Sequence, residues 1–249
     1  MSIILSQNGK NAKRLERTSI QTEDYLQRYI HDNPESLPIQ ELKEGIRLLN
    51  IAREFPTNSG PIDLIAIDQE ADIYIVETKL YKNTDKRRVI AQILDYGAAL
   101  WNCGATAFMD SLENAAISQF NMGLRAKLEE HYGMDSVAVD EYLNLLQQKA
   151  SEGRFRFIVL MDQLDTRLKD LISFINSNSR FDIFGIELDF YQHQDFEIVI
   201  PNLYGAELKK EVASIASSTP RRKWNEAEFF QQVAQQLSQE WGEKMHELY

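Results

Sequence analysis

Two carboxylates and an ammonium group stand at the ends of two neighbouring apolar segments. Asp63 lies near the start of IDLIAID, and Glu77 and Lys79 lie near the end of DIYIVETK. Only residues 69–71 separate these β-branched segments, which predicts an antiparallel hairpin. The three charged residues therefore occupy the positions where a buried hairpin becomes accessible.

The register of this hairpin decides whether the charged groups meet. Side chains alternate between the two faces of a strand, so Glu77 and Lys79 share one face. A three-residue loop that pairs Asp68 with Asp72 places Asp63 opposite Glu77. The sequence therefore predicts that two carboxylates and one ammonium converge at one end of the hairpin.

Such a trio suits a magnesium-dependent phosphodiesterase. Mg²⁺ prefers oxygen ligands and keeps several waters, so one or two carboxylates can hold it beside a phosphate and an attacking water. The metal lowers the pKa of its bound water and shields developing negative charge. Lys79 then either helps to remove the proton of that water or stabilises the transition state, and both roles stay open.

These residues resemble the motifs of a known family. Residues 60–63 (GPID), followed by residues 77–79 (ETK), resemble the PD-(D/E)XK nuclease superfamily, with the spacing of its RecB-like branch. Gln92 and Tyr96 match the QxxxY motif of that branch, and Glu23 matches the acidic residue of its first helix. The proline precedes Asp63 by two positions instead of one. The resemblance covers the first hundred residues well and is weaker up to about residue 205.

The resemblance implies a fold, an activity and a site. The fold is a restriction-endonuclease-like α/β domain over residues 1–213, with a mixed β-sheet flanked by helices. The activity is hydrolysis of DNA phosphodiester bonds with Mg²⁺ or Mn²⁺. Asp63 and Glu77 would hold the metal with help from Glu23, while Gln92 and Tyr96 would face the active site and the nucleic-acid backbone.

Other interpretations of the same residues remain. Asp63 alone suits a strand edge, and Glu77 with Lys79 suits a surface ion pair. Gln92 and Tyr96 also suit ordinary helix residues, with Tyr96 in the core. Glu23 is favoured at a helix start by the helix dipole, and its neighbour Asp24 competes for the same role. A rival hypothesis keeps the fold and discards catalysis, leaving an inactive nucleic-acid-binding or interaction module. Serine or cysteine hydrolase chemistry has little support, because no nucleophile elbow is present.

The charge distribution indicates where a nucleic acid would bind. The chain carries a formal net charge of −11, so contact with phosphates depends on local basic segments. The segment next to the trio is the best placed, and beyond Lys79 it contains Lys82, Lys86, Arg87 and Arg88. Two further basic segments, which suit either phosphate contact or plain solvation, comprise Lys10, Lys13, Arg14 and Arg17, and Arg221, Arg222 and Lys223. DNA is the expected partner, RNA is not excluded, and repair, restriction and defence roles stay open.

The remaining pattern alternates between helical and extended segments. We expect helices at residues 21–32, 84–101 (with Thr84 as N-cap), 111–151 (interrupted near Tyr132-Gly133) and 163–178. We expect strands at 46–55 and 154–161, and a second hairpin formed by 184–191 and 196–201.

The C-terminal part reads as a linker at residues 214–223 and an amphipathic helix. Its apolar stripe comprises Phe229, Val233, Leu237, Trp241 and Met245. Such a stripe packs on something. The chain's own core, a homodimer contact and the first piece of a further domain are the open alternatives.

Composition sets broad limits on the class of protein. No apolar run approaches the ~20 residues that span a bilayer, and the first residues lack the charge order of a secretory signal. We therefore expect a soluble cytoplasmic protein. Cys103 lies in an apolar stretch and is expected to be a small buried side chain, and the four histidines form no ligand-spaced pair for zinc.

Overall fold

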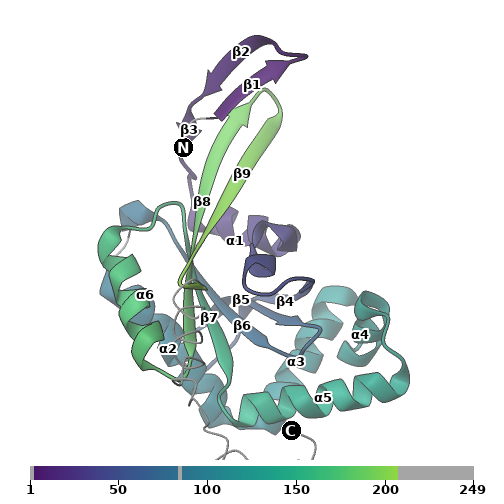
Figure 1. Cartoon of the computed structure of the whole chain (residues 1–249). Coiled ribbons are helices and arrows are strands. Elements are labelled where there is room, and N and C mark those ends of the chain that lie inside the picture. Colours follow the sequence, from purple (N-terminus) through teal and green to yellow (C-terminus); the bar gives the residue numbers. More distant parts are fainter. Residues whose placement is uncertain (1–2, 84–85, 207–249) are drawn as a thin grey trace, which may run out of the picture. The chain divides into compact units, whose positions relative to one another are not determined.

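The computed structural model describes residues 3–83 and 86–206, with the backbone alone at residues 86 and 87. Within this part of the chain, a seven-stranded sheet forms the centre of the fold (Figure 1). Its strands are β3 (Arg17–Thr18), β4 (Leu48–Phe55), β5 (Ile62–Asp68), β6 (Ile73–Lys79), β7 (Phe155–Met161), β8 (Asp182–His193) and β9 (Phe196–Tyr204).

The sheet is mixed. Strands β4, β5 and β6 pair antiparallel, β6, β7 and β8 pair parallel, and β8 pairs antiparallel with both β9 and β3. Parallel neighbours need a long crossover, and helices supply both of the crossovers here. The parallel pairing brings the carboxyl ends of β6, β7 and β8 to the same edge of the sheet.

Helices cover both faces of the sheet. They are α1 (Glu23–Asp32), α2 (Lys86–Cys103), α3 (Ala105–Phe120), α4 (Leu124–Tyr132), α5 (Ser136–Ser151) and α6 (Thr166–Asn178), with short 3₁₀ turns at Pro34–Ser36, Ile39–Glu41 and Tyr81–Asn83. One core contains α1 residues, and the other contains residues of α2 to α6. Figure 1 shows α1 and α6 on opposite sides of the sheet. None of the helices among the described residues has both the length and the apolar character needed to cross a membrane.

Local signals explain the ends of the elements. Thr22 caps α1 by accepting a hydrogen bond from the Tyr25 amide at 3.1 Å, and the helix stops before Pro34. Strands β5 and β6 are buried along almost their whole length, as their continuous apolar sequences require. These residues therefore form a rigid support for the charged positions at the strand ends.

Most of the expected elements are confirmed, with corrections to their bounds. The α/β fold with a mixed sheet between helices is present, as are both hairpins. The helical region after α2 begins at Ala105, and it breaks at Gly133 as predicted and also at Asn121, where the backbone turns left-handed (φ +56). Thr84 lies outside the described residues, and so do the linker at 214–223 and the C-terminal stripe.

Two features differ from expectation. The first residues form a hairpin of β1 (Ile3–Gln7) and β2 (Lys10–Leu15), whose signal is the Asn8-Gly9 pair at its turn. Cys103 is exposed instead of buried. It stands at the end of α2, where Gly104 turns the chain with φ +85, so its apolar neighbours in sequence do not enclose it.

Candidate active site

The β5–β6 hairpin has the predicted register. Ile67 pairs with Ile73 and Leu64 with Val76, and the Asp68 amide donates to the Asp72 carbonyl across the turn. Asp63 and Glu77 lie directly beyond the pair of Leu64 with Val76, and there the Thr78 amide donates to the Asp63 side chain. The charge of Asp63 acts on the pKa of Glu77, as expected for two carboxylates at the same end of the hairpin.

Asp63 is buried and held by the neighbouring strand. The amide and the hydroxyl of Thr78 both donate to its Oδ2, each at 2.7 Å. Burial raises the pKa of Asp63, although these hydrogen bonds and the positive charge of Lys79 oppose the shift. Thr78, the middle residue of the ETK motif, thus orients the first carboxylate. This role of Thr78 was not predicted from the sequence.

Glu77 is fully buried, and its carboxylate lacks a full set of hydrogen-bond partners among the described residues. Its Oε1 lies 2.8 Å from the Lys79 ammonium, and its Oε2 has no hydrogen-bond partner among the described residues. Burial, followed by the charge of Asp63, raises the pKa of Glu77 to about 7. A buried carboxylate without full compensation is costly, and such groups concentrate at functional sites.

Lys79 joins the sheet to α1. Its ammonium contacts Glu77 at 2.8 Å and Glu23 at 3.6 Å. Burial lowers the pKa of Lys79, but the hydrogen bond and charge of Glu77, together with Glu23 and Asp63, raise it on balance. The lysine is therefore a fixed cation between two carboxylates.

Glu23 faces the site, whereas Asp24 does not. The Leu80 amide donates to Glu23 Oε1 at 3.2 Å, which ties α1 to the end of β6. Asp24 instead pairs with Arg28 and Arg53. The predicted choice of Glu23 is consistent with this placement, while its role as a metal ligand stays a prediction.

Gln92 and Tyr96 lie together on α2. The Gln92 side-chain amide donates to the Tyr96 hydroxyl at 2.7 Å, and Tyr96 belongs to the hydrophobic core. Burial raises the pKa of Tyr96 to about 12, and the charges of Glu77 and Asp63 act in the same direction. The predicted pair thus lies on one face of α2, where the Tyr96 ring packs in the core and its hydroxyl is within range of the charges of the two carboxylates.

The basic segment after Lys79 is only partly described. Lys82 is exposed, and its ammonium donates to the Gln21 carbonyl at 3.2 Å. Arg88 is exposed on α2. The side chains of Lys86 and Arg87 lie outside the described residues, so their predicted contact with nucleic acid stays a prediction.

Asp162 is a further neighbour of the site that was not predicted from the sequence. It follows β7, and its Oδ1 accepts a hydrogen bond from the Tyr81 amide at 2.7 Å, two residues beyond Lys79. A signal was available, because polar residues at the carboxyl ends of neighbouring parallel strands meet at one edge. That signal predicts the position of Asp162 only once β6 and β7 are known to pair in parallel.

The donor set fits a hard divalent cation held by two carboxylates. Within residues 3–83 and 86–206, no group of three or more His, Cys, Asp or Glu side chains is arranged to hold a metal ion. Asp63 and Glu77 supply oxygen atoms, including the buried Glu77 Oε2 that lacks a hydrogen-bond partner among those residues. Mg²⁺ is commonly bound by one or two carboxylates plus substrate oxygens and water.

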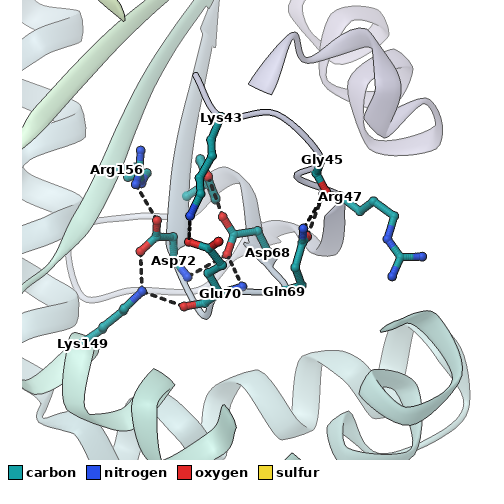
Figure 2. Close-up of polar contacts among 10 residues, drawn as sticks. Lys43, Gly45, Arg47, Asp68, Gln69, Glu70, Asp72, Lys149 and Arg156 are labelled. Atoms are coloured by element: carbon teal, nitrogen blue, oxygen red, sulfur yellow. Dashed lines mark hydrogen bonds and ion pairs between the residues drawn. The ribbon is translucent and has the colours of Figure 1, made fainter. Parts of the chain in front are cut away.

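The other end of the same hairpin contains a different charged cluster (Figure 2). Asp68 Oδ1 accepts from the amides of Glu70 and Asp72 at 2.8 and 3.0 Å, and Asp68 Oδ2 accepts from the Tyr74 hydroxyl at 2.8 Å. The turn also includes Ala71 in the left-handed region (φ +61). These bonds fix the turn geometry and with it the hairpin register.

Distant elements hold this turn in place. Lys149 reaches from α5 to the Glu70 carbonyl at 2.7 Å and to Asp72 Oδ1 at 2.6 Å, and Arg156 of β7 contacts Asp72 Oδ2 at 2.6 Å. Figure 2 shows Lys149 and Arg156 approaching Asp72 from different elements. These interactions offset the cost of burial, so the pKa of Asp72 lies below its ordinary value.

Comparison with known proteins gives limited matches. No family model matches the sequence. A stretch of 63 residues is 36% identical to endonuclease NucS from Bifidobacterium animalis subsp. lactis (strain AD011), which is 25% of this chain and 24% of that protein. The chain thus matches about a quarter of the length of this relative. Its likeness to the crystal structure of a repair endonuclease from Pyrococcus abyssi has a TM-score of 0.27 and 15% identity, over 75% of this chain and 65% of that chain.

Proposed function

We propose that the chain is a metal-dependent nuclease of the PD-(D/E)XK type that hydrolyses phosphodiester bonds in DNA. The observation that carries this proposal is the buried Glu77, whose Oε2 has no hydrogen-bond partner among the described residues, whose pKa is raised in part by the charge of Asp63, and which lies 2.8 Å from the Lys79 ammonium. The partial sequence likeness to an endonuclease supports the same activity.

Each residue has a defined task in this proposal. Asp63, oriented by Thr78, and Glu77 would together hold Mg²⁺ or Mn²⁺. When bound, the cation would supply Lewis-acid activation and neutralise negative charge on the phosphate. Glu77 and Glu23 keep Lys79 charged and in place, so it would stabilise the developing charge of the transition state.

The surroundings of the trio favour catalysis on a polymer backbone. The hydroxyl of Tyr96 is within range of the charges of the carboxylates, and Tyr96 and Gln92 would position the scissile phosphate. Lys82 and Arg88 are exposed near the start of α2, and with Lys86 and Arg87 they form the nearest basic segment. Phosphate contacts of this kind orient a substrate without reading its sequence.

The test is cleavage of labelled DNA by the purified chain with Mg²⁺ or Mn²⁺, compared with Asp63→Ala, Glu77→Ala and Lys79→Ala. We expect each substitution to abolish cleavage while the circular dichroism spectrum stays unchanged. A panel of single-stranded, duplex, flapped and circular substrates, with an RNA control, would define the polymer. Full activity in a variant would remove that residue from the mechanism. DNA binding without cleavage by the unaltered chain would favour the inactive binding module.

A further inference from the structure

The N-terminal hairpin is an exposed two-stranded ribbon. In β1 and β2, Leu15 is buried and Ile3 half-buried, while the other residues are exposed. Ile4 is 63% exposed and Leu5 38%. An isolated two-stranded hairpin gains little stability from its own contacts. Most of the ribbon surface is therefore accessible, and little of it packs on the core.

The ribbon is basic in an acidic protein. Lys10, Lys13 and Arg14 lie in it, and the first fifteen residues contain no Asp or Glu, although the chain has a net charge of −11. In the described part of the molecule, none of these three cations is in an ion pair or a side-chain hydrogen bond. Arg17, by contrast, is paired with Glu187 and Asp189. The three ribbon cations are thus available to an external anion.

The strand pairing distributes these cations over both faces of the ribbon. Lys13 lies opposite Leu5, and Arg14 lies opposite Ile4. Neighbouring residues on a strand point to opposite faces, so Lys13 and Arg14 point to different sides. The ribbon ends in a tight turn with φ +51 at Asn8 and +73 at Gly9. A narrow ribbon with cations on both faces suits a groove whose two walls carry phosphates.

The base of the ribbon is joined to the edge of the sheet that contains the active site. Arg17 pairs with Tyr191 of β8, and its guanidinium donates to the Asp162 carbonyl. Asp162 in turn accepts from the Tyr81 amide, close after Lys79. Figure 1 shows the ribbon beyond the tip of β8 and β9. A polymer that binds the ribbon therefore binds an element whose base contacts the sheet edge where the proposed active site lies.

We propose that the β1–β2 ribbon binds duplex DNA by its groove, and this proposal rests on the proposed nuclease function. Charge complementarity selects a polyanion. The major groove of B-form DNA, about 12 Å wide, admits a two-stranded β-ribbon, whereas the major groove of double-stranded RNA is too narrow and deep. Lys10, Lys13 and Arg14 contact phosphates, so the ribbon contributes affinity and orientation without touching the catalytic trio.

The test compares two triple variants of the full chain. The ribbon variant carries Lys10→Gln, Lys13→Gln and Arg14→Gln, and the control carries Arg125→Gln, Lys127→Gln and Arg154→Gln, which also remove three positive charges. Binding to a short duplex is measured by fluorescence anisotropy over a salt series, with a chelator present so that no cleavage occurs. We expect the slope of log K against log salt to become less negative by about 2.7 in the ribbon variant and to stay unchanged in the control.

Further measurements make each outcome decisive. Lys10→Arg with Lys13→Arg should keep the slope of the unaltered chain, because both cations are retained. The ribbon variant should lose more affinity for the duplex than for the single strand of the same sequence. Equal slopes in the unaltered chain and the ribbon variant, an equal change in the control, or no DNA binding at all would overturn the proposal. An equal loss on duplex and single strand would overturn the assignment to a duplex groove.

Different results would contradict the ribbon proposal and the nuclease proposal. Binding is measured without catalysis, so a chain that never cleaves still reveals the ribbon effect. If cleavage occurs, the ribbon variant should raise KM and leave kcat unchanged. Cleavage with an unchanged KM in this variant would leave the nuclease proposal intact and remove the ribbon from it.

Discussion

The two ends of the β5–β6 hairpin differ in how many hydrogen-bond and ion-pair partners their buried carboxylates have. At the turn, Asp68 accepts three hydrogen bonds, and Asp72 is paired with two cations from distant elements. At the other end, Glu77 has a single ammonium partner, and its pKa rises to about 7. The same strands therefore combine a charged cluster that supports the structure with Glu77, whose Oε2 has no hydrogen-bond partner among the described residues.

The largest expected difference between the two ends is catalytic. Glu77→Gln should lower kcat for DNA cleavage on the order of a thousand-fold, because it removes a charge that would act in the transition state. Asp68→Asn, at the turn, should leave kcat within about tenfold, since it lies outside the site. Steady-state cleavage assays measure both. Similar losses in the two variants would contradict the division of roles.

The reverse difference is expected for stability. Asp72→Ala leaves Lys149, whose side chain is 10% exposed, without its carboxylate, and should lower the free energy of unfolding by about 3 kcal/mol. Asp140→Ala is the control, because it breaks the exposed pair with Arg125, which solvent screens, and should therefore cost much less stability. Urea denaturation measures both changes. Equal losses would show that the turn cluster contributes no more than a surface pair.

The pH dependence of stability should also separate the ends. The pKa of Glu77 is raised from 4.5 to about 7, so in the metal-free chain its contribution to stability should be fully present below pH 4.5 and fall by up to about 3 kcal/mol as pH rises through 7. Glu77→Gln should abolish this loss. The pKa of Asp72 is lowered, so its contribution is present above pH 3.8 and is lost as pH falls further. Thermal unfolding measured as a function of pH, with a chelator present, tests both directions of change. If the Glu77→Gln variant loses as much stability between pH 4.5 and 7 as the unaltered chain, Glu77 is not the cause of the loss.

The smallest effect on cleavage is expected from a substitution in α2. Gln92→Ala removes the hydrogen bond to the Tyr96 hydroxyl and one polar group beside the site, so KM should rise by about tenfold, which corresponds to one hydrogen bond. Stability should change by less than about 1 kcal/mol, because Gln92 is only half-buried. Cleavage kinetics and urea titration together check this. An unchanged KM would place Gln92 outside substrate binding.

Local patterns accounted for much of the fold and the site. Alternating apolar residues and the short 69–71 loop predicted the hairpin and its register, and the helical spacing of Gln92 and Tyr96 placed both on one face. Side-chain alternation repeats every two residues, so a short loop fixes which positions face each other. The missed N-terminal hairpin also had a local signal, in Asn8-Gly9.

The sequence by itself determined the identity of the charged trio and the register of the β5–β6 hairpin from Leu64 to Ile67, because both follow from patterns within a few residues. Only the tertiary structure decided how each charge is compensated. Lys149 is 77 residues from its partner Asp72 along the chain, Asp162 meets Tyr81 through parallel pairing, and Cys103 is exposed despite its apolar neighbours. Burial and long-range ion pairs depend on how whole elements pack, so they distinguish the unsatisfied Glu77 from the satisfied Asp72 where sequence spacing does not.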